Sequence, residues 1–179
     1  RLVSRAIGLD QYQTTPSAFP ARRLSQPSPR GTDVSVTLDL VTHDIDLMLW
    51  LMGGSPTEVE GETFSTYSQT IDDTSATCRY GEPESYLAAS RTGEEPNARE
   101  FIAVYEDGVV EIDFAAKTVI SDLPFPLNTD FAENPMAKDS LGAATDMFVC
   151  AVLDGGPVSV TAQEGLDVLR VALKIDAGG

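Results

Sequence analysis

Asp39 and His43 are the residues of this sequence best suited to chemistry, and they stand four positions apart in a mostly apolar segment, residues 38–54. His43 is the only histidine of the chain. On an α-helix, side chains at positions i and i+4 are neighbours, so this carboxylate can meet the imidazole. A carboxylate placed there orients the ring and favours its protonated form, which makes a pair suited to proton transfer.

Two other roles for this pair have to be weighed. A histidine near an aspartate on a helix is more often structural than catalytic. A metal site would need ligands beyond Asp39, His43 and Asp46, and no further ligands can be identified in the sequence. The two cysteines, Cys78 and Cys150, also lack metal-ligand spacing, so we expect no metal.

The helix that carries the pair is expected to run from a cap at Thr32 or Asp33 to about Met52. At about 100° per residue, six of its polar side chains fall on one narrow strip: Thr32, Ser35, Asp39, Thr42, His43 and Asp46. Only Thr37 and Asp44 interrupt the apolar remainder. A helix with such a narrow polar face is buried on most sides, and we expect it to form one wall of a catalytic cleft.

Arginine side chains supply a second set of candidates. Arg23, Ser25 and Arg30 precede the helix in the one cationic segment of an acidic chain, and Arg91 follows an expected strand. Guanidinium groups bind phosphate and carboxylate well, so these four residues are candidates for substrate binding. The alternative is that the arginines pair with acids at the surface.

The composition restricts the classes of partner. The chain has 179 residues, 42% of them hydrophobic, and a formal net charge of −16. This suits one folded domain and disfavours binding to nucleic acid phosphates. No apolar run reaches the ~18 residues of a membrane span, and no signal peptide is expected. With two cysteines and no disulfide framework, we expect reduced thiols and a cytoplasmic protein.

The order of elements predicts an α+β fold rather than a doubly wound α/β fold. Residues 10–31 hold four prolines and predict an extended, edge-like strand or loop. Alternating patterns between residues 57 and 121, with a hairpin turn at Asp107-Gly108, predict a largely antiparallel sheet. Two helices follow, about Asp139–Leu153 and from a capping box at Thr161. No Gly-x-Gly-x-x-Gly turn is present, so we expect no Rossmann domain in this chain.

The Asp-x-x-x-His spacing within "DLVTHDIDLMLWLMG" resembles the C-terminal domain of the glucose–fructose oxidoreductase/inositol dehydrogenase/rhizopine-catabolism (Gfo/Idh/MocA) family. The preceding "RRLSQPSPRGTDV" resembles the UDP-N-acetylglucosamine 3-dehydrogenase-like branch of that family. The "AASR" segment and the closing helices are also similar to the family. The resemblance covers about residues 20–179.

This resemblance implies a two-domain oxidoreductase, of which residues 1–179 are the substrate-binding and dimerisation domain. The implied fold is an open, mainly antiparallel sheet with helices packed on one face. The residue matching His43 would exchange a proton with a substrate hydroxyl during hydride transfer, and the residue matching Asp39 would orient it or contact the substrate. NAD or NADP would bind to the N-terminal Rossmann domain, so the cofactor-binding residues lie outside this chain, which alone should be inactive.

We therefore expect part of an NAD(P)-dependent dehydrogenase that oxidises a hydroxyl group of a sugar or UDP-sugar, with Asp39 and His43 handling the proton. We also expect a homo-oligomer formed through the free sheet face, with no nucleic acid or membrane partner. The alternative is a non-catalytic sugar-binding or dimerisation module that has lost its cofactor domain. A third interpretation is a family member that acts on inositol or a simple aldose.

Overall fold

The computed structural model describes residues 1–29, 31–93 and 96–178. Within this part of the chain, seven strands form one open sheet in the order β2-β3-β4-β1-β5-β6-β7. The strands are β1 (Ala18–Leu24), β2 (Glu58–Phe64), β3 (Asp73–Arg79), β4 (Glu84–Ser90), β5 (Ala98–Tyr105), β6 (Gly108–Asp113) and β7 (Thr118–Ser121). Only β1 and β4 pair in parallel, and all other neighbours are antiparallel. The predicted α+β fold with a mainly antiparallel sheet is confirmed.

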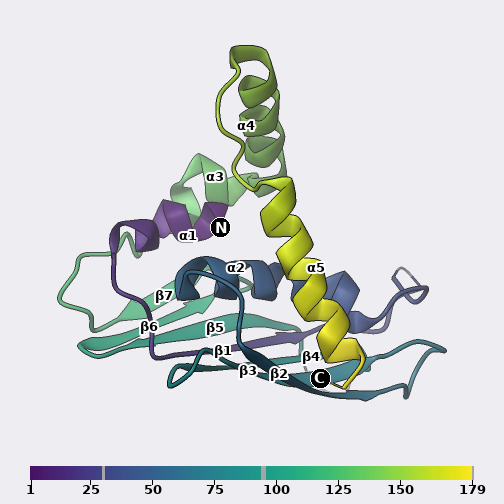
Figure 1. Cartoon of the computed structure of the whole chain (residues 1–179). Helices are drawn as coiled ribbons and strands as arrows, with labels where there is room; N and C mark the ends of the chain where they lie inside the picture. The colour runs from purple at the N-terminus through teal and green to yellow at the C-terminus, as the bar shows by residue number, and fades with distance from the viewer. Residues whose placement is uncertain (30, 94–95, 179) are drawn as a thin grey trace.

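Helices cover one face of this sheet (Figure 1). They are α1 (Leu2–Ile7), α2 (Thr42–Met52), α3 (Pro135–Lys138), α4 (Ser140–Asp154) and α5 (Ala162–Asp176), with short turns η1 (Leu9–Gln11), η2 (Thr37–Val41) and η3 (Phe131–Glu133). The predicted capping box begins α5, because the Thr161 hydroxyl accepts from the Glu164 amide and the Glu164 carboxylate accepts from the Thr161 amide. The predicted hairpin turn at Asp107-Gly108 joins β5 to β6.

Strand β1 lies at the centre of the sheet, so the prediction that residues 10–31 form an edge-like strand or loop is wrong for Ala18–Leu24. Pro20 lacks an amide hydrogen, and the register with β5 skips Phe19 and Pro20 while Ala18 still pairs with Val104. A central strand tolerates this proline because β1 keeps a continuous register with β4 on its other side.

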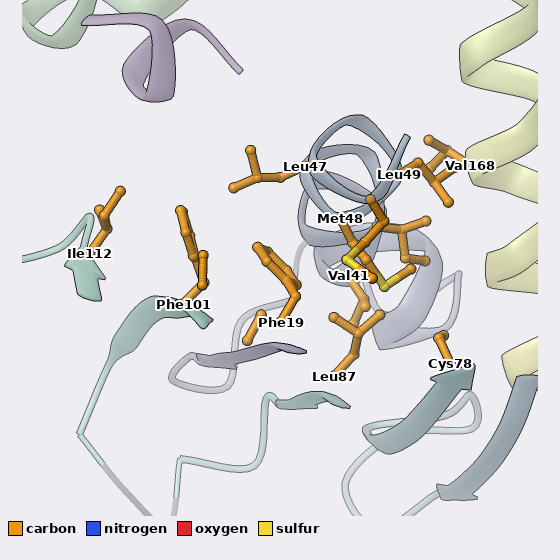
Figure 2. Packing of buried hydrophobic residues seen from close by; sticks show 14 of the residues in the cluster. Phe19, Val41, Leu47, Met48, Leu49, Cys78, Leu87, Phe101, Ile112 and Val168 are labelled. Atoms are coloured by element: carbon orange, nitrogen blue, oxygen red, sulfur yellow. The ribbon is translucent and has the colours of Figure 1, made fainter. Parts of the chain in front are cut away.

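The core lies between the sheet and α2. Alternate residues of the central strands point toward the helix, and Figure 2 shows Phe19, Leu87 and Phe101 rising from their strands below α2. The Phe19 and Phe101 rings stack with centroids 5.0 Å apart. Met48 of α2 is fully buried above them. Complete burial of such side chains stabilises the fold by about 1.5–3 kcal/mol each, and this packing holds α2 in a fixed position on the sheet.

Helix α4 projects away from the sheet and has little protein around it (Figure 1). Its sequence is mostly apolar, yet Leu141 is 78% exposed and Leu153 is 77% exposed, while only Ala151 is buried. On α5, Val168 and Ala172 face the core. Three of its leucines remain exposed instead: Leu166, Leu169 and Leu173. In the described part of the chain, no helix combines the length and apolar character needed to cross a membrane.

Candidate functional site

The helix that carries His43 begins later than the sequence predicts. Residues 31–33 form a turn instead of a helix cap. The side chain that accepts from the first helical amides is the hydroxyl of Ser35, at 3.1 Å from the Leu38 amide. Ser35 Oγ also donates to Asp176 Oδ2 at 2.6 Å. The start of the helix is therefore tied to the end of α5, a contact between distant segments that local patterns do not contain.

The first turns of this helix are wider than an ordinary α-helix. Residues Thr37–Val41 form a π-helical turn before α2 continues from Thr42. Such turns insert an extra residue into the helix and occur frequently at functional sites. Asp39 lies within this turn, and His43 follows it in the first turn of α2.

Asp39 faces the loop that precedes the helix. A Cβ atom added to Gly31 would lie only 2.3 Å from Asp39 Oδ2, so this carboxylate lies directly against the Gly31 backbone. Gly31 has φ of 77°, a conformation that favours glycine. Among the described residues, no hydrogen bond joins Asp39 to His43. The proton-transfer pair of Asp39 and His43 therefore stays a prediction.

His43 lies in the first turn of α2 with its side chain exposed. Although the residue reaches solvent, the protein around it partly desolvates the ring, and this lowers the pKa of the imidazole below its ordinary value. The positive charges of Arg23 and Arg99 lower the pKa further, while Asp44 and Asp46 oppose them. The shift of the His43 pKa is therefore opposite in direction to the expectation of a stabilised imidazolium.

Arg23 belongs to a buried ion pair. Its Nε and Nη2 donate to the two carboxylate oxygens of Asp44 at 2.8 and 2.7 Å, and Asp44 adjoins His43 in α2. Arg23 is 7% exposed and Asp44 is 8% exposed. The pair joins the central strand to the helix that carries His43. The proposed phosphate-binding role of Arg23 stays a prediction, because its bidentate face is already used by Asp44.

Arg91 is buried in a network of protein acceptors, and its role in substrate binding stays a prediction. Its Nε donates to Asp72 Oδ1 at 2.9 Å and its Nη1 to the Gly31 carbonyl at 2.6 Å. Its Nη2 donates to the carbonyls of Val34 and Ile71 at 2.9 and 3.0 Å. Since the side chain is only 4% exposed and its donors serve protein acceptors, Arg91 fastens the turn that leads into the helix.

Asp72 is the counterpart of Arg91. Its Oδ2 accepts from the amides of Thr66, Tyr67 and Ser68 at 3.1, 2.7 and 2.6 Å. Complete burial would raise the pKa of Asp72, but these donors and Arg91 hold it well below its usual range. A permanently charged carboxylate thus anchors the guanidinium behind the helix entry.

The other predicted ligands contribute less. Ser25 is half-buried, and its amide donates to the Ser90 carbonyl at 2.9 Å, so it extends the pairing of β1 with β4. Its role in substrate binding stays a prediction. Arg30 lies outside the residues that the structure describes.

Two residues near His43 were missed by the sequence analysis. Asp44 interrupts the apolar side of the helix, and that interruption was the signal that a buried cation must meet it. Arg99 sits opposite Arg23 in the register of β1 and β5 and reaches solvent. Its guanidinium carbon lies 5.2 Å from the centroid of the Phe114 ring. Nothing in the alternating strand pattern distinguishes Arg99 from a surface arginine.

The open side of α2 is not closed by this chain. A hollow of about 500 Å³ lies on the other face of the sheet, lined by residues such as Tyr86, Glu100 and Ile120, and it does not include His43. Within residues 1–29, 31–93 and 96–178, no group of three His, Cys, Asp or Glu side chains is arranged to hold a metal ion. The exposed imidazole of His43 therefore lies outside this hollow.

Comparison with known proteins places this architecture among oxidoreductases. The model of the GFO/IDH/MocA C-terminal domain matches residues 11–111. A UDP-N-acetylglucosamine 3-dehydrogenase of Acidithiobacillus ferrooxidans is 31% identical over 169 residues, which cover 89% of this chain and 53% of that protein. This chain thus spans about half the length of that relative.

Solved structures give the same picture. The UDP-N-acetylglucosamine 3-dehydrogenase GnnA from Acidithiobacillus ferrooxidans superposes with a TM-score of 0.85 at 28% identity, covering 99% of this chain and 59% of that chain. A scyllo-inositol dehydrogenase from Lactobacillus casei, solved with bound NAD(H) and scyllo-inositol, shares the fold with a TM-score of 0.71 at 17% identity. The superposition covers 99% of this chain and 58% of the scyllo-inositol dehydrogenase.

Proposed function

Because this chain belongs to the Gfo/Idh/MocA family of oxidoreductases, we propose that it is the substrate-side domain of an NAD(P)-dependent dehydrogenase acting on a sugar or nucleotide-sugar hydroxyl. The observation that carries the proposal is an exposed imidazole with a lowered pKa, held on a rigid helix. The relative at 31% identity is named for the 3-dehydrogenation of UDP-N-acetylglucosamine. A nucleotide sugar is therefore the substrate class we favour.

His43 takes the proton in this proposal. Oxidation of a hydroxyl to a ketone releases one hydride and one proton, and a neutral imidazole beside the hydroxyl can accept the proton. The lowered pKa of His43 keeps the ring neutral at neutral pH. Asp39 serves the same site indirectly, because its carboxylate lies against Gly31 and shapes the loop beside the helix.

The hydride acceptor lies outside this chain. A nicotinamide cofactor supplies hydride transfer when bound, but the residues described here do not fit a dinucleotide. Their only parallel strand contact joins β1 to β4, and no strand leads through a glycine-rich turn into a helix. The domain alone is therefore inactive, and a nucleotide-binding domain must complete the site.

The exposed apolar side chains of α4 support such a second domain. Phe148, Val152 and Leu153 are 59%, 63% and 77% exposed on one helix. Apolar surface of this kind marks an interaction site. We assign α4 to the contact with the nucleotide-binding domain.

The other face of the sheet is assigned to self-association. Tyr86 is 50% exposed and Ile120 is 66% exposed there, at the rim of the 500 Å³ hollow. No helix covers this face (Figure 1). A homo-oligomer formed through it would leave α2 and α4 free for the substrate and for the second domain. The free thiols of Cys78 and Cys150 suit a cytoplasmic enzyme.

The test uses the full-length protein that carries the upstream domain. Reduction of NAD⁺ or NADP⁺, followed by absorbance, is measured with UDP-N-acetylglucosamine, N-acetylglucosamine and myo-inositol. We expect turnover with the nucleotide sugar, and a loss of about 10²–10⁴-fold in His43→Asn, the range of general acid–base contributions. Glu62→Gln, on the distant strand β2, is the control. Normal turnover in His43→Asn would refute the role of the imidazole, and an absence of any cofactor reduction would favour the non-catalytic module.

A further inference from the structure

Arg99 carries a guanidinium that has no carboxylate partner in the described part of the chain. It follows the same alternation along β5 as Phe101, which faces the helices, so it lies on the side of the sheet that carries α2. Among the described residues no acid lies within ion-pair distance of Arg99, and its recorded partner is the ring of Phe114.

Arg99 also stands directly opposite another cation. Its partner in the register is Arg23, and side chains in such positions lie close together. Both carboxylate oxygens of Asp44 accept hydrogen bonds from Arg23, and no hydrogen bond to Arg99 is found among the described residues. Desolvation and the charge of Arg23 lower the pKa of Arg99, while Asp44 opposes them. The cluster therefore keeps one uncompensated positive charge in a chain whose formal charge is −16.

The charge of Arg99 acts on the imidazole, because Arg99 and Arg23 both lower the pKa of His43. Asp44 adjoins His43 in α2, and its carboxylate reaches down to Arg23, the neighbour of Arg99. An anion bound by Arg99 would be held close to the ring. Phosphate and carboxylate groups match the planar guanidinium fork.

We propose that Arg99 binds the anionic group of the substrate, a diphosphate in a nucleotide sugar, and so places the sugar against His43. The proposal rests on the proposed function, and it names a residue for the substrate's charge whose guanidinium, unlike those of Arg23 and Arg91, pairs with no buried acid among the described residues. A cofactor also carries a pyrophosphate, so the experiment separates these two sources.

The experiment titrates this chain with UDP, UDP-N-acetylglucosamine, NAD⁺ and N-acetylglucosamine, and follows the ring signals of His43 by NMR. The chain has a single histidine, so the signals need no assignment. We expect UDP and UDP-N-acetylglucosamine to shift these signals with saturation, and NAD⁺ to act much more weakly. If NAD⁺ bound as tightly as UDP or more tightly, Arg99 would belong to a cofactor site, and the proposal would be overturned.

The matched variants are Arg99→Gln and Arg170→Gln. Arg170 is an exposed arginine on α5 that pairs with Asp167. We expect Arg99→Gln to raise the Kd for UDP at least about tenfold, the value of one charge-assisted contact, and to leave N-acetylglucosamine binding unchanged. Arg170→Gln should change neither, and Arg99→Lys should recover part of the affinity.

An unshifted His43 signal in the unaltered chain, or equal Kd values for UDP in the two glutamine variants, would overturn the proposal. These outcomes are distinct from failure of the proposed function. If Arg99→Gln binds UDP normally while His43→Asn abolishes turnover of the full-length enzyme, only this inference fails. If Arg99 governs UDP binding while His43→Asn turns over normally, only the catalytic role fails.

Discussion

Arg23 and Asp44 form a bidentate ion pair that joins the central strand β1 to the helix α2 that carries His43. Both side chains are almost fully buried. Burying two charges costs desolvation energy, and a pair of this kind is retained only when its geometry is good and its partners are both present. The pair fixes on the sheet the helix that carries the imidazole.

Removing one member of this pair should be severe. Arg23→Ala leaves the Asp44 carboxylate buried and uncompensated, so we expect a loss of about 3–5 kcal/mol in the free energy of unfolding. Urea denaturation followed by circular dichroism measures this loss. The control is Arg170→Ala, which removes an exposed pair with Asp167 worth about 0–1 kcal/mol. Equal losses in the two variants would mean that the buried pair does not hold α2.

The sequence predicted the parts of this architecture whose causes are local. The capping box at Thr161 and the turn at Asp107-Gly108 depend on residues within a few positions of each other, and both are present. The position of His43 on an apolar helix follows from its immediate neighbours in the same way.

Contacts between distant segments could not be predicted from such patterns. Arg23 and Asp44 lie 21 positions apart, and Arg91 reaches the Gly31 carbonyl across 60 positions. Their pairing depends on β1 lying at the centre of the sheet, which four prolines in residues 10–31 argued against. The π-helical turn that contains Asp39 likewise has no signal in the helical pattern of the sequence.

The Arg91–Asp72 network predicts a dependence of stability on acid. The pKa of Asp72 is lower in the folded chain than its ordinary value of 3.8. The charged Asp72 therefore contributes fully to the free energy of unfolding above pH 3.8, and this contribution is lost as the pH falls below 3.8. In Asp72→Asn this part of the acid dependence should disappear, and the uncompensated Arg91 should cost about 3–5 kcal/mol at pH 7. Chemical denaturation at a series of pH values tests both effects. An unchanged acid profile in Asp72→Asn would show that other carboxylates govern it.

His43 should titrate below the ordinary histidine pKa of 6.5. Desolvation and the neighbouring arginines disfavour the imidazolium, so Arg99→Gln, which removes one positive charge, should raise the pKa of His43. Proton NMR of the single histidine across pH 4–8 measures the shift. Arg170→Gln serves as the control and should leave the pKa where it is. A pKa of His43 above 6.5 in the unaltered chain would contradict the neutral base.

The lowered pKa of His43 also predicts how the activity of the full-length enzyme depends on pH. Oxidation requires the neutral imidazole, so kcat/KM should fall as the pH decreases through the pKa of His43. In Arg99→Gln, kcat/KM should begin to fall at a higher pH, because the imidazole of His43 is protonated more easily in this variant. A pH profile that does not move in this variant would separate the catalytic base from His43.

Helix α4 should bind the second domain through its apolar face. Phe148 is 59% exposed, so Phe148→Glu should leave the stability of the present chain within about 0.5 kcal/mol. In the full-length enzyme, the same change would bury a charge in the contact and should lower the melting temperature and the cofactor-dependent turnover together. Ile120→Glu is the matched control, because Ile120 is 66% exposed on the opposite face of the sheet. It should alter the oligomeric mass, measured by light scattering, without loosening the two domains. If Phe148→Glu changed the oligomeric mass while the domains stayed together, α4 would be the surface of self-association instead.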